Sequence, residues 1–152
     1  MQPYLSEQFE AMMAEEDLRF LCFENYERYE FGVTCKNGSW HVVVNFKYTK
    51  KLFVVKCIAP FKLNHNRKVE IDDLLHRINH EFSLGHFAIN YESGNIRLVI
   101  AIPIFETADV RSHMRKIVFG AVNRFDKYLP AILNVNFSQA DPSLVFIETH
   151  NL

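Results

Sequence analysis

The sequence contains few of the residues that mark several common classes of protein. Its 152 residues include 3 cysteines, an odd number without a Cys-x-x-Cys pair, which is typical of a reducing compartment and not of a disulfide-stabilised domain. Only 5 glycines and 5 prolines are present, too few for a collagen-like or linker protein. A Gly-x-Ser-x-Gly motif and a glycine-rich phosphate loop are also lacking. We therefore expect a protein that is not an enzyme and has no cofactor.

Long apolar runs are absent as well. The richest run, residues 98–105, spans eight residues and contains Pro103, whereas a membrane helix needs about 20 apolar residues. The first residues lack the basic and apolar regions of a signal peptide. Cys35 and Cys57 lie in apolar runs, where a thiol usually behaves as a small hydrophobe. We expect a cytoplasmic protein that does not contact a membrane.

The overall composition is that of a folded protein. Apolar residues make up 49% of the chain, and phenylalanine alone occurs 14 times. The 17 basic and 18 acidic residues give a net charge of −1, which excludes wholesale disorder and a uniformly basic nucleic-acid binder. We expect a single domain over residues 1–152, and the sequence does not predict how residues 134–152 pack.

Hydrophobic spacing predicts three helices. They are expected over residues 3–21, 71–82 and 107–129. The spacing slips after Ala14, so residues 18–23 fit either a continued helix or an extended segment. Gly85 is placed to end the second helix, and Pro130 either ends the third helix or starts a short extra turn.

Alternating apolar and polar residues predict five strands. They are expected over residues 31–35, 40–47, 52–58, 87–89 and 96–102, and a further strand-like run covers residues 144–147. Pro60 opens a predicted loop over residues 59–68. The order of helix, three strands, helix, two strands and helix predicts an α+β fold around an antiparallel five-stranded sheet.

The alternation also sorts the strand residues onto two faces of the predicted sheet. One face is apolar and is expected to meet the core: Val33, Cys35, Val42, Val44, Phe46, Phe53, Val55, Phe87, Ile96, Leu98, Ile100 and Ile102. The other face mixes charges with small apolar residues, which fits partial cover by another subunit and ordinary scattered apolar surface equally well. Its candidate partner or dimer surface consists of Val43, Val54, Lys56, Arg97, Val99 and Ala101.

Several stretches resemble the YbjN-like family, whose fold is similar to that of the type III secretion chaperones. They are the hairpin Asn37-Gly-Ser-Trp-His-Val-Val-Val, the helical Leu74-Leu-His-Arg-Ile-Asn, the continuation Phe82-Ser-Leu-Gly-His-Phe-Ala-Ile and the turn Ser93-Gly-Asn-Ile-Arg. The resemblance covers residues 3–133 and implies a bacterial homodimer that binds proteins and has no catalytic centre. The leading hypothesis is therefore a non-enzymatic homodimeric protein-binding domain with a chaperone-like or regulatory role.

Charge is unevenly distributed along the chain. Residues 1–30 hold eight acids and two bases, whereas residues 31–68 hold eight bases and no acid. Aromatic residues interleaved with bases can stack on nucleobases while lysine holds phosphate. The alternative function is thus a nucleic-acid-binding module, with Lys47, Tyr48, Lys50 and Lys51 as its surface. We favour two simpler explanations: the acidic first helix packs near the basic strands, or the lysines protect strand edges from aggregation.

His76 and His80 lie four residues apart on the second predicted helix. This spacing can place two imidazoles on one metal ion. Glu81 follows the second histidine instead of the first, so the zinc-protease pattern is not met, and the sequence indicates no third ligand. We favour a solvated helix face and expect no metal site.

Overall fold

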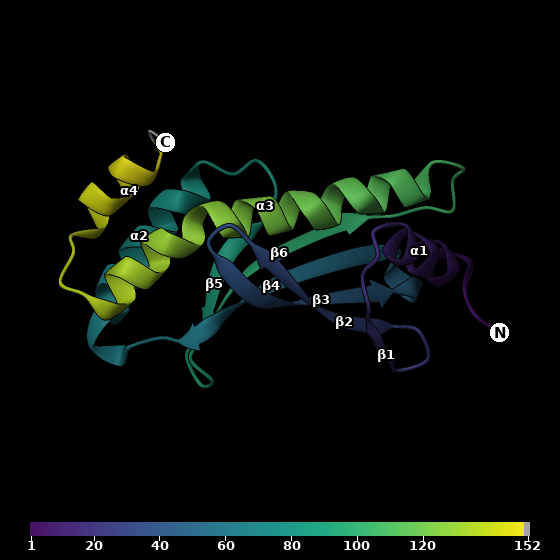
Figure 1. Cartoon of the computed structure of the whole chain (residues 1–152), viewed down its shortest axis with the longest axis horizontal. Helices are drawn as coiled ribbons and strands as arrows, with labels where there is room; N and C mark the ends of the chain where they lie inside the picture. Colours follow the sequence, from purple (N-terminus) through teal and green to yellow (C-terminus); the bar gives the residue numbers. More distant parts are fainter. Residues whose placement is uncertain (151–152) are drawn as a thin grey trace.

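The computed structural model describes residues 1–150 as a single antiparallel sheet with helices packed against it (Figure 1). The helices are α1 (Tyr4–Glu15), α2 (Lys68–His80), α3 (Val110–Phe137) and α4 (Pro142–His150), with short 3-10 helices η1 (Tyr48–Lys50) and η2 (His65–Arg67). The strands are β1 (Leu21–Phe23), β2 (Arg28–Cys35), β3 (Gly38–Lys47), β4 (Leu52–Lys62), β5 (His86–Asn90) and β6 (Asn95–Pro103), in the sheet order β1-β2-β3-β4-β6-β5. The α+β class is confirmed, whereas the prediction of five strands is wrong, because residues 1–150 form a 6-stranded sheet.

The additional strand is β1, which pairs with the start of β2. It can form because α1 ends at Glu15, where the Leu18 N–H donates to the Met13 carbonyl at 2.9 Å and Asp17 adopts a left-handed φ of 55°. The predicted first helix is therefore too long, and the extended alternative for residues 18–23 is confirmed in its second half. With three residues, β1 is too short for alternation to reveal it.

β4 runs through Pro60, where the sequence predicts a loop. Its pairing with β3 ends at Ile58, and its register with β6 shifts between Ile58 and Lys62. Proline cannot donate a hydrogen bond to a neighbouring strand, so it is tolerated at Pro60, where β4 is no longer paired with β3. The predicted loop over residues 59–68 is therefore wrong at its start.

α3 continues through Pro130 to Phe137. Pro130 itself is exposed, while Ala131, Ile132 and Val135 extend the buried face of the helix. Tertiary packing of this face offsets the backbone hydrogen bond that proline removes. Both predicted alternatives at Pro130, an end of the helix or the start of a short extra turn, are therefore wrong, because α3 continues without a break to Phe137.

The chain after α3 forms α4 and not the predicted strand at residues 144–147. Pro142 stands at the first helical position, where its missing N–H costs nothing. The Asp141 carboxylate accepts a hydrogen bond from the Ser143 N–H at 2.9 Å and so caps the new helix. These two local signals outweigh the strand propensity of the apolar run.

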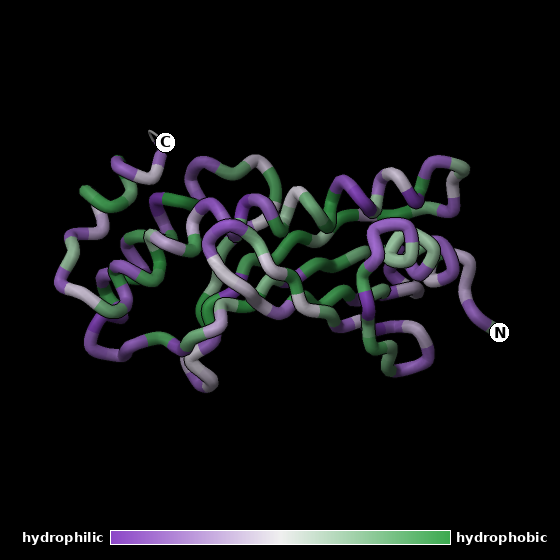
Figure 2. Tube along the Cα trace, in the orientation of Figure 1, coloured by the Kyte–Doolittle hydropathy of each residue, from purple (hydrophilic) through white to green (hydrophobic). Residues whose placement is uncertain are grey.

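The hydrophobic core lies between one face of the sheet and the helices. The Phe9 ring of α1 lies 4.8 Å from Tyr29, and the Phe125 ring of α3 lies 5.0 Å from Trp40, measured between ring centroids. Every residue that alternation assigned to the core face is buried or half-buried, which confirms that assignment. Figure 2 shows apolar residues concentrated along the central strands.

Two glycines lead to opposite predictions. Gly85 lies beyond the end of α2 and does not cap it; it adopts a φ of 84°, and an added Cβ would lie 2.7 Å from Ile100 Cγ1. Gly120 lies inside α3, and an added Cβ would meet nothing within 4 Å.

We expect Gly85→Ala to lower the free energy of unfolding by about 1–3 kcal/mol. Gly120→Ala is the matched control and is expected to raise that free energy by up to about 1 kcal/mol. Urea unfolding of both variants measures the difference, and a loss of stability in Gly120→Ala would contradict the open space beside it.

Candidate functional site on the outer face of the sheet

The outer face of the sheet is the face turned away from the helices. α1 and α3 pack on the opposite, inner face, through contacts such as Phe9 with Phe46 and Phe125 with Trp40. α2 lies beside the edge strand β5, where the Asn79 side chain donates to the Phe87 carbonyl and accepts from its N–H. Figure 1 shows α3 running along one side of the sheet, and no helix within residues 1–150 crosses the other side.

The six residues predicted as a partner or dimer surface all lie on this outer face. Because successive strand residues point to opposite faces, the observed register keeps them together. They form three rows across the sheet: Val43, Lys56 and Val99; Val54 and Ala101; and Arg97 beside Ile58. The placement follows the prediction, and their role as a binding surface stays a prediction.

A hollow of about 420 Å³ lies in the middle of the outer face. Its lining residues are Arg28, Glu30, Val43, Asn45, Lys56, Ile58 and Arg97. Apolar and charged side chains therefore meet in one shallow depression that is open to solvent. Small molecules usually bind in enclosed, mainly apolar pockets, so this depression fits a segment of a protein better.

The acid that lines the hollow, Glu30, is engaged by neighbours on the same face. His41 Nε2 lies 2.8 Å from Glu30 Oε1, and Arg28 Nε lies 3.3 Å from Oε2. The Arg28 guanidinium also lies 4.6 Å above the centre of the Phe23 ring. The carboxylate is thus held at one side of the hollow by its own local partners.

Lys56 and Arg97 have no such partner. Neither side chain forms an ion pair or a hydrogen bond within residues 1–150. Burial, together with the nearby charges of Arg97 and Lys47, lowers the pKa of Lys56. Arg97 Nε is buried and has no hydrogen-bond partner. The hollow therefore contains two partly desolvated cations without an acid to pair with them.

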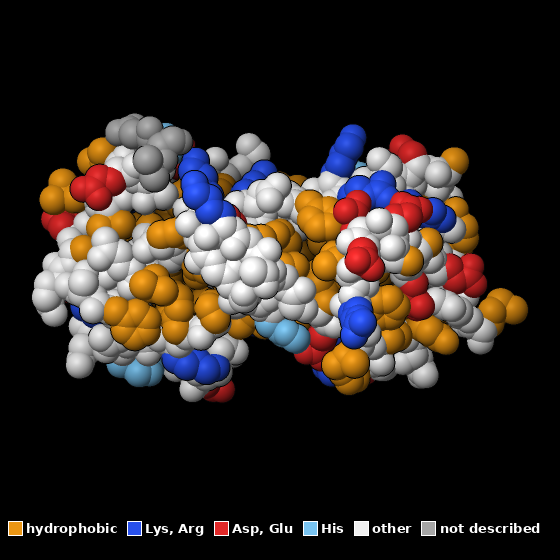
Figure 3. All heavy atoms as spheres, in the orientation of Figure 1, with side chains coloured by type: hydrophobic (Ala, Val, Ile, Leu, Met, Phe, Trp, Pro, Cys, Tyr) orange, Lys and Arg blue, Asp and Glu red, His pale blue; other side chains and the backbone are white. Residues whose placement is uncertain are grey.

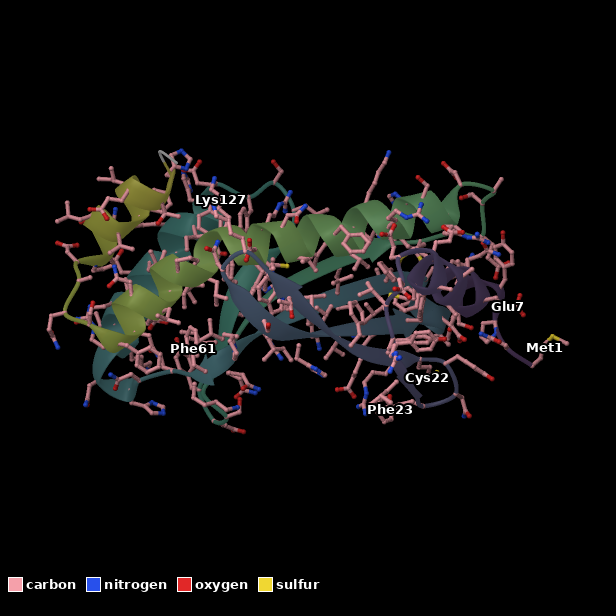
Figure 4. The ribbon with its side chains drawn as sticks, in the orientation of Figure 1. Met1, Glu7, Cys22, Phe23, Phe61 and Lys127 are labelled. Atoms are coloured by element: carbon pink, nitrogen blue, oxygen red, sulfur yellow. The ribbon has the colours of Figure 1, made fainter. Side chains whose placement is uncertain are left out.

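Sequence reasoning missed the part of the outer face that β1 contributes. The register pairs Leu21 with Glu30 and Phe23 with Arg28, so both apolar residues join this face. Leu21 is 63% exposed and Phe23 is 36% exposed. Figure 4 shows Phe23 on the side of the sheet opposite α3. An extended interpretation of residues 18–23 would have revealed both residues.

The alternative nucleic-acid surface does not offer a free stacking ring. Tyr48 stacks on Phe46 with ring centroids 5.5 Å apart, and its hydroxyl donates to the Tyr26 carbonyl at 2.5 Å. Burial raises the pKa of Tyr48 to about 12. The three neighbouring lysines of that surface are exposed: Lys47, Lys50 and Lys51. Because the ring is already packed, nucleic-acid binding here is not favoured.

The first helix packs near the basic strands, as the first explanation of the charge pattern expects, because the Phe9 ring of α1 packs on Phe46 of β3 and Phe53 of β4. The acids at the end of the helix, Glu15 and Glu16, pair with Arg111 and Arg115 of α3, and Arg115 Nε lies 2.9 Å from Glu16 Oε1. Figure 3 shows acidic and basic side chains next to each other where α1 meets the start of α3. The hydrogen bond from Arg111 lowers the pKa of Glu15. Protection of strand edges by the lysines stays a prediction.

His76 and His80 are both exposed on α2. They line a groove together with Arg77, Glu81 and Phe146 of α4. Within residues 1–150, no group of three or more histidine, cysteine, aspartate or glutamate side chains could hold a metal ion. Two imidazoles alone give a metal fewer protein ligands than structural or catalytic zinc sites use.

The three cysteines differ in burial and are expected to differ in reactivity. Cys22 is exposed; burial and the Asp126 charge raise the pKa of Cys35; and burial raises the pKa of Cys57 to about 12. A thiol reagent near pH 8 is expected to modify Cys22 quickly, Cys35 slowly and Cys57 only after unfolding. The absorbance change of the reagent counts the modified thiols, and Cys22→Ser should remove the fast phase. Fast modification of Cys57 in the folded chain would contradict its burial.

A second exposed apolar cluster lies near the end of α3. Phe137 is 61% exposed, and its ring centroid lies 5.4 Å from that of Phe61 on β4. Leu133, one turn earlier on α3, is also exposed. Figure 3 shows a group of hydrophobic side chains at the lower left, where Figure 4 places Phe61. The sequence did not predict this cluster, because Leu133 and Phe137 lie beyond the predicted end of the helix near Pro130.

Comparison with known proteins shows the fold to be YbjN-like and similar to that of the type III secretion chaperones. The crystal structure of YbjN from E. coli, described as a proposed transcription regulator, superposes with a TM-score of 0.61 at 8% sequence identity over 86% of this chain and 92% of that chain. The crystal structure of the ExsC–ExsE complex gives a TM-score of 0.58 at 11% identity over 86% of this chain and 94% of that chain. The sequence matches no protein-family model and no curated protein. No helix within residues 1–150 is long and apolar enough to span a membrane.

Proposed function

We propose that the chain is a non-enzymatic, homodimeric, cytoplasmic protein-binding domain with a chaperone-like or regulatory role. The observation that carries this proposal is the outer face of the sheet. It combines apolar residues with unpaired cations, and no helix within residues 1–150 covers it. Large exposed apolar surfaces rimmed by polar residues are typical of protein-interaction sites.

The fold likeness supports the same proposal. One structural neighbour is described as a proposed regulator, and the other is a complex of two proteins. α1 and α3 both pack on the inner face of the sheet, so the outer face is available for a partner or for a second copy of the chain. Val43, Lys56 and Val99 lie in one row of that face.

Affinity capture, with the tagged chain and its variants as bait, tests whether the outer face binds proteins. The tagged chain, its double variant Val43→Asp/Val99→Asp and the control Val69→Asp are purified in parallel. Val69 is 76% exposed on α2, away from the outer face, so it matches the chemistry of the change without altering the site. We expect the wild type and the control to retain the same protein, and the double variant to lose it.

The same three proteins decide which occupant the face takes. If the double variant has half the solution mass of the wild type, the outer face holds a second copy. If its mass is unchanged and only the captured protein is lost, the face holds a partner. Retention of identical proteins by all three would contradict a binding role for the outer face, and thermal unfolding confirms that each variant is folded.

A further inference from the structure

We propose that the outer face recognises an acidic segment of a partner protein, with Lys56 and Arg97 binding a carboxylate between apolar contacts. This inference rests on the proposed function and names the chemistry of the partner. The two residues occupy adjacent strands, where Lys56 pairs with Val99 and Arg97 pairs with Ile58. They are therefore diagonal neighbours on one face, and long side chains can meet across such a diagonal.

The first argument is that these cations have no carboxylate of their own. Glu30 is engaged by Arg28 and His41 and is not bonded to either of them. Arg97 Nε is buried without a hydrogen-bond partner within residues 1–150. A partly buried cation without a counter-charge is costly, and a carboxylate from a partner would supply that charge.

The second argument is the composition of the hollow around them. Val43 and Ile58 line the same depression as the two cations, and Val99 lies beside Lys56 in the strand register. An extended peptide places alternate side chains on the same side. A segment with one or more acidic residues among apolar ones would therefore match both the charge and the apolar surface.

Two other occupants fit less well. A second copy would bring an identical set of cations, Lys56 and Arg97, against the first, and like charges in a partly desolvated interface repel. Nucleic acid would supply negative phosphates, but the residues that line the hollow include no aromatic ring on which a base could stack. A carboxylate on a partly apolar peptide meets neither objection, because it is opposite in charge to the two cations and needs no aromatic ring for stacking.

The test uses two fluorescein-labelled peptides and the full chain. One peptide alternates valine with glutamate, and the other has glutamine in place of every glutamate. Fluorescence anisotropy is expected to show that wild type binds the acidic peptide at least about tenfold more tightly, since a charge-assisted hydrogen bond contributes about that factor. Lys56→Gln and Arg97→Gln should each reduce the preference for the acidic peptide. The control Lys116→Gln, at an exposed position of α3, should keep that preference.

Each other outcome overturns the acidic recognition. Equal binding of both peptides, lost in Val43→Asp/Val99→Asp, would leave the outer face as a protein-binding surface without a preference for acids. Binding of neither peptide would also reject the acidic recognition, while the capture experiment still decides the proposed function. Binding of single-stranded oligonucleotide alone, removed by Lys56→Gln, would assign the face to nucleic acid. A change in solution mass on Lys56→Gln would assign it to a second copy.

Discussion

Replacing Phe9 by alanine is expected to lower the free energy of unfolding by about 3–5 kcal/mol. The Phe9 ring is fully buried and anchors α1 to the inner face of the sheet. It packs in an aromatic cluster with Tyr29, Phe46 and Phe53, at centroid distances of 4.8, 5.8 and 6.3 Å. Truncation leaves a cavity that rigid strand residues cannot fill, so the lost contacts add to the lost hydrophobic burial.

Urea unfolding followed by tryptophan fluorescence measures this effect. Trp40 is the single tryptophan, and its buried ring packs on Phe125 of α3, so it reports the loss of the core. Phe105→Ala is the matched control, because Phe105 is 57% exposed and its truncation is expected to cost less than about 1 kcal/mol. Similar losses in both variants would show that α1 is not anchored through Phe9.

Replacing Asn136 by leucine is expected to lower the free energy of unfolding by about 2–4 kcal/mol. Asn136 is fully buried near the end of α3. Its Oδ1 accepts from the Asn64 N–H at 2.8 Å, and its Nδ2 donates to the Lys62 carbonyl at 3.0 Å. Leucine has a similar size but leaves both partly buried backbone groups without partners, and a buried group left in this way costs about 1–3 kcal/mol.

Amide hydrogen exchange locates the damage that Asn136→Leu causes. Arg67 donates to the Val135 and Ala140 carbonyls in the same region, so the segment after β4 and the end of α3 are joined by several bonds. We expect faster exchange in residues 131–137 and 62–67, with β2 and β3 unchanged. Asn123→Leu, the same replacement at an exposed position of α3, is expected to change stability by less than about 0.5 kcal/mol. Equal stability of the two variants would contradict this role of the buried amide.

The sequence predicts the sheet well wherever alternation extends over many residues. The inner residues of β3, β4 and β6 alternate over most of their lengths, so the core face could be assigned residue by residue. β1 could not be found, because three residues hold too little alternation and its formation depends on where α1 ends. The continuation of α3 past Pro130 depends on Asn136 and Arg67, whose partners lie far away in the sequence.

The candidate site could be predicted in part for the same reason. Alternation places Val43, Lys56 and Val99 on one face, and the strand register then puts them in one row. Which charges stay unpaired could not be predicted, because that depends on the contacts of Glu30 with Arg28 and His41 across the sheet. Charge counts along the chain do not predict which groups pair, since Glu15 and Glu16 at the end of α1 pair with Arg111 and Arg115 of α3.

The solution mass of the purified chain, measured by light scattering at low and at moderate salt, tests the proposed homodimeric protein-binding domain most directly. The chain has a mass of 17.9 kDa. The proposal predicts twice that mass at both salt concentrations. A mass of 17.9 kDa under both conditions, with the protein folded, would contradict the homodimer.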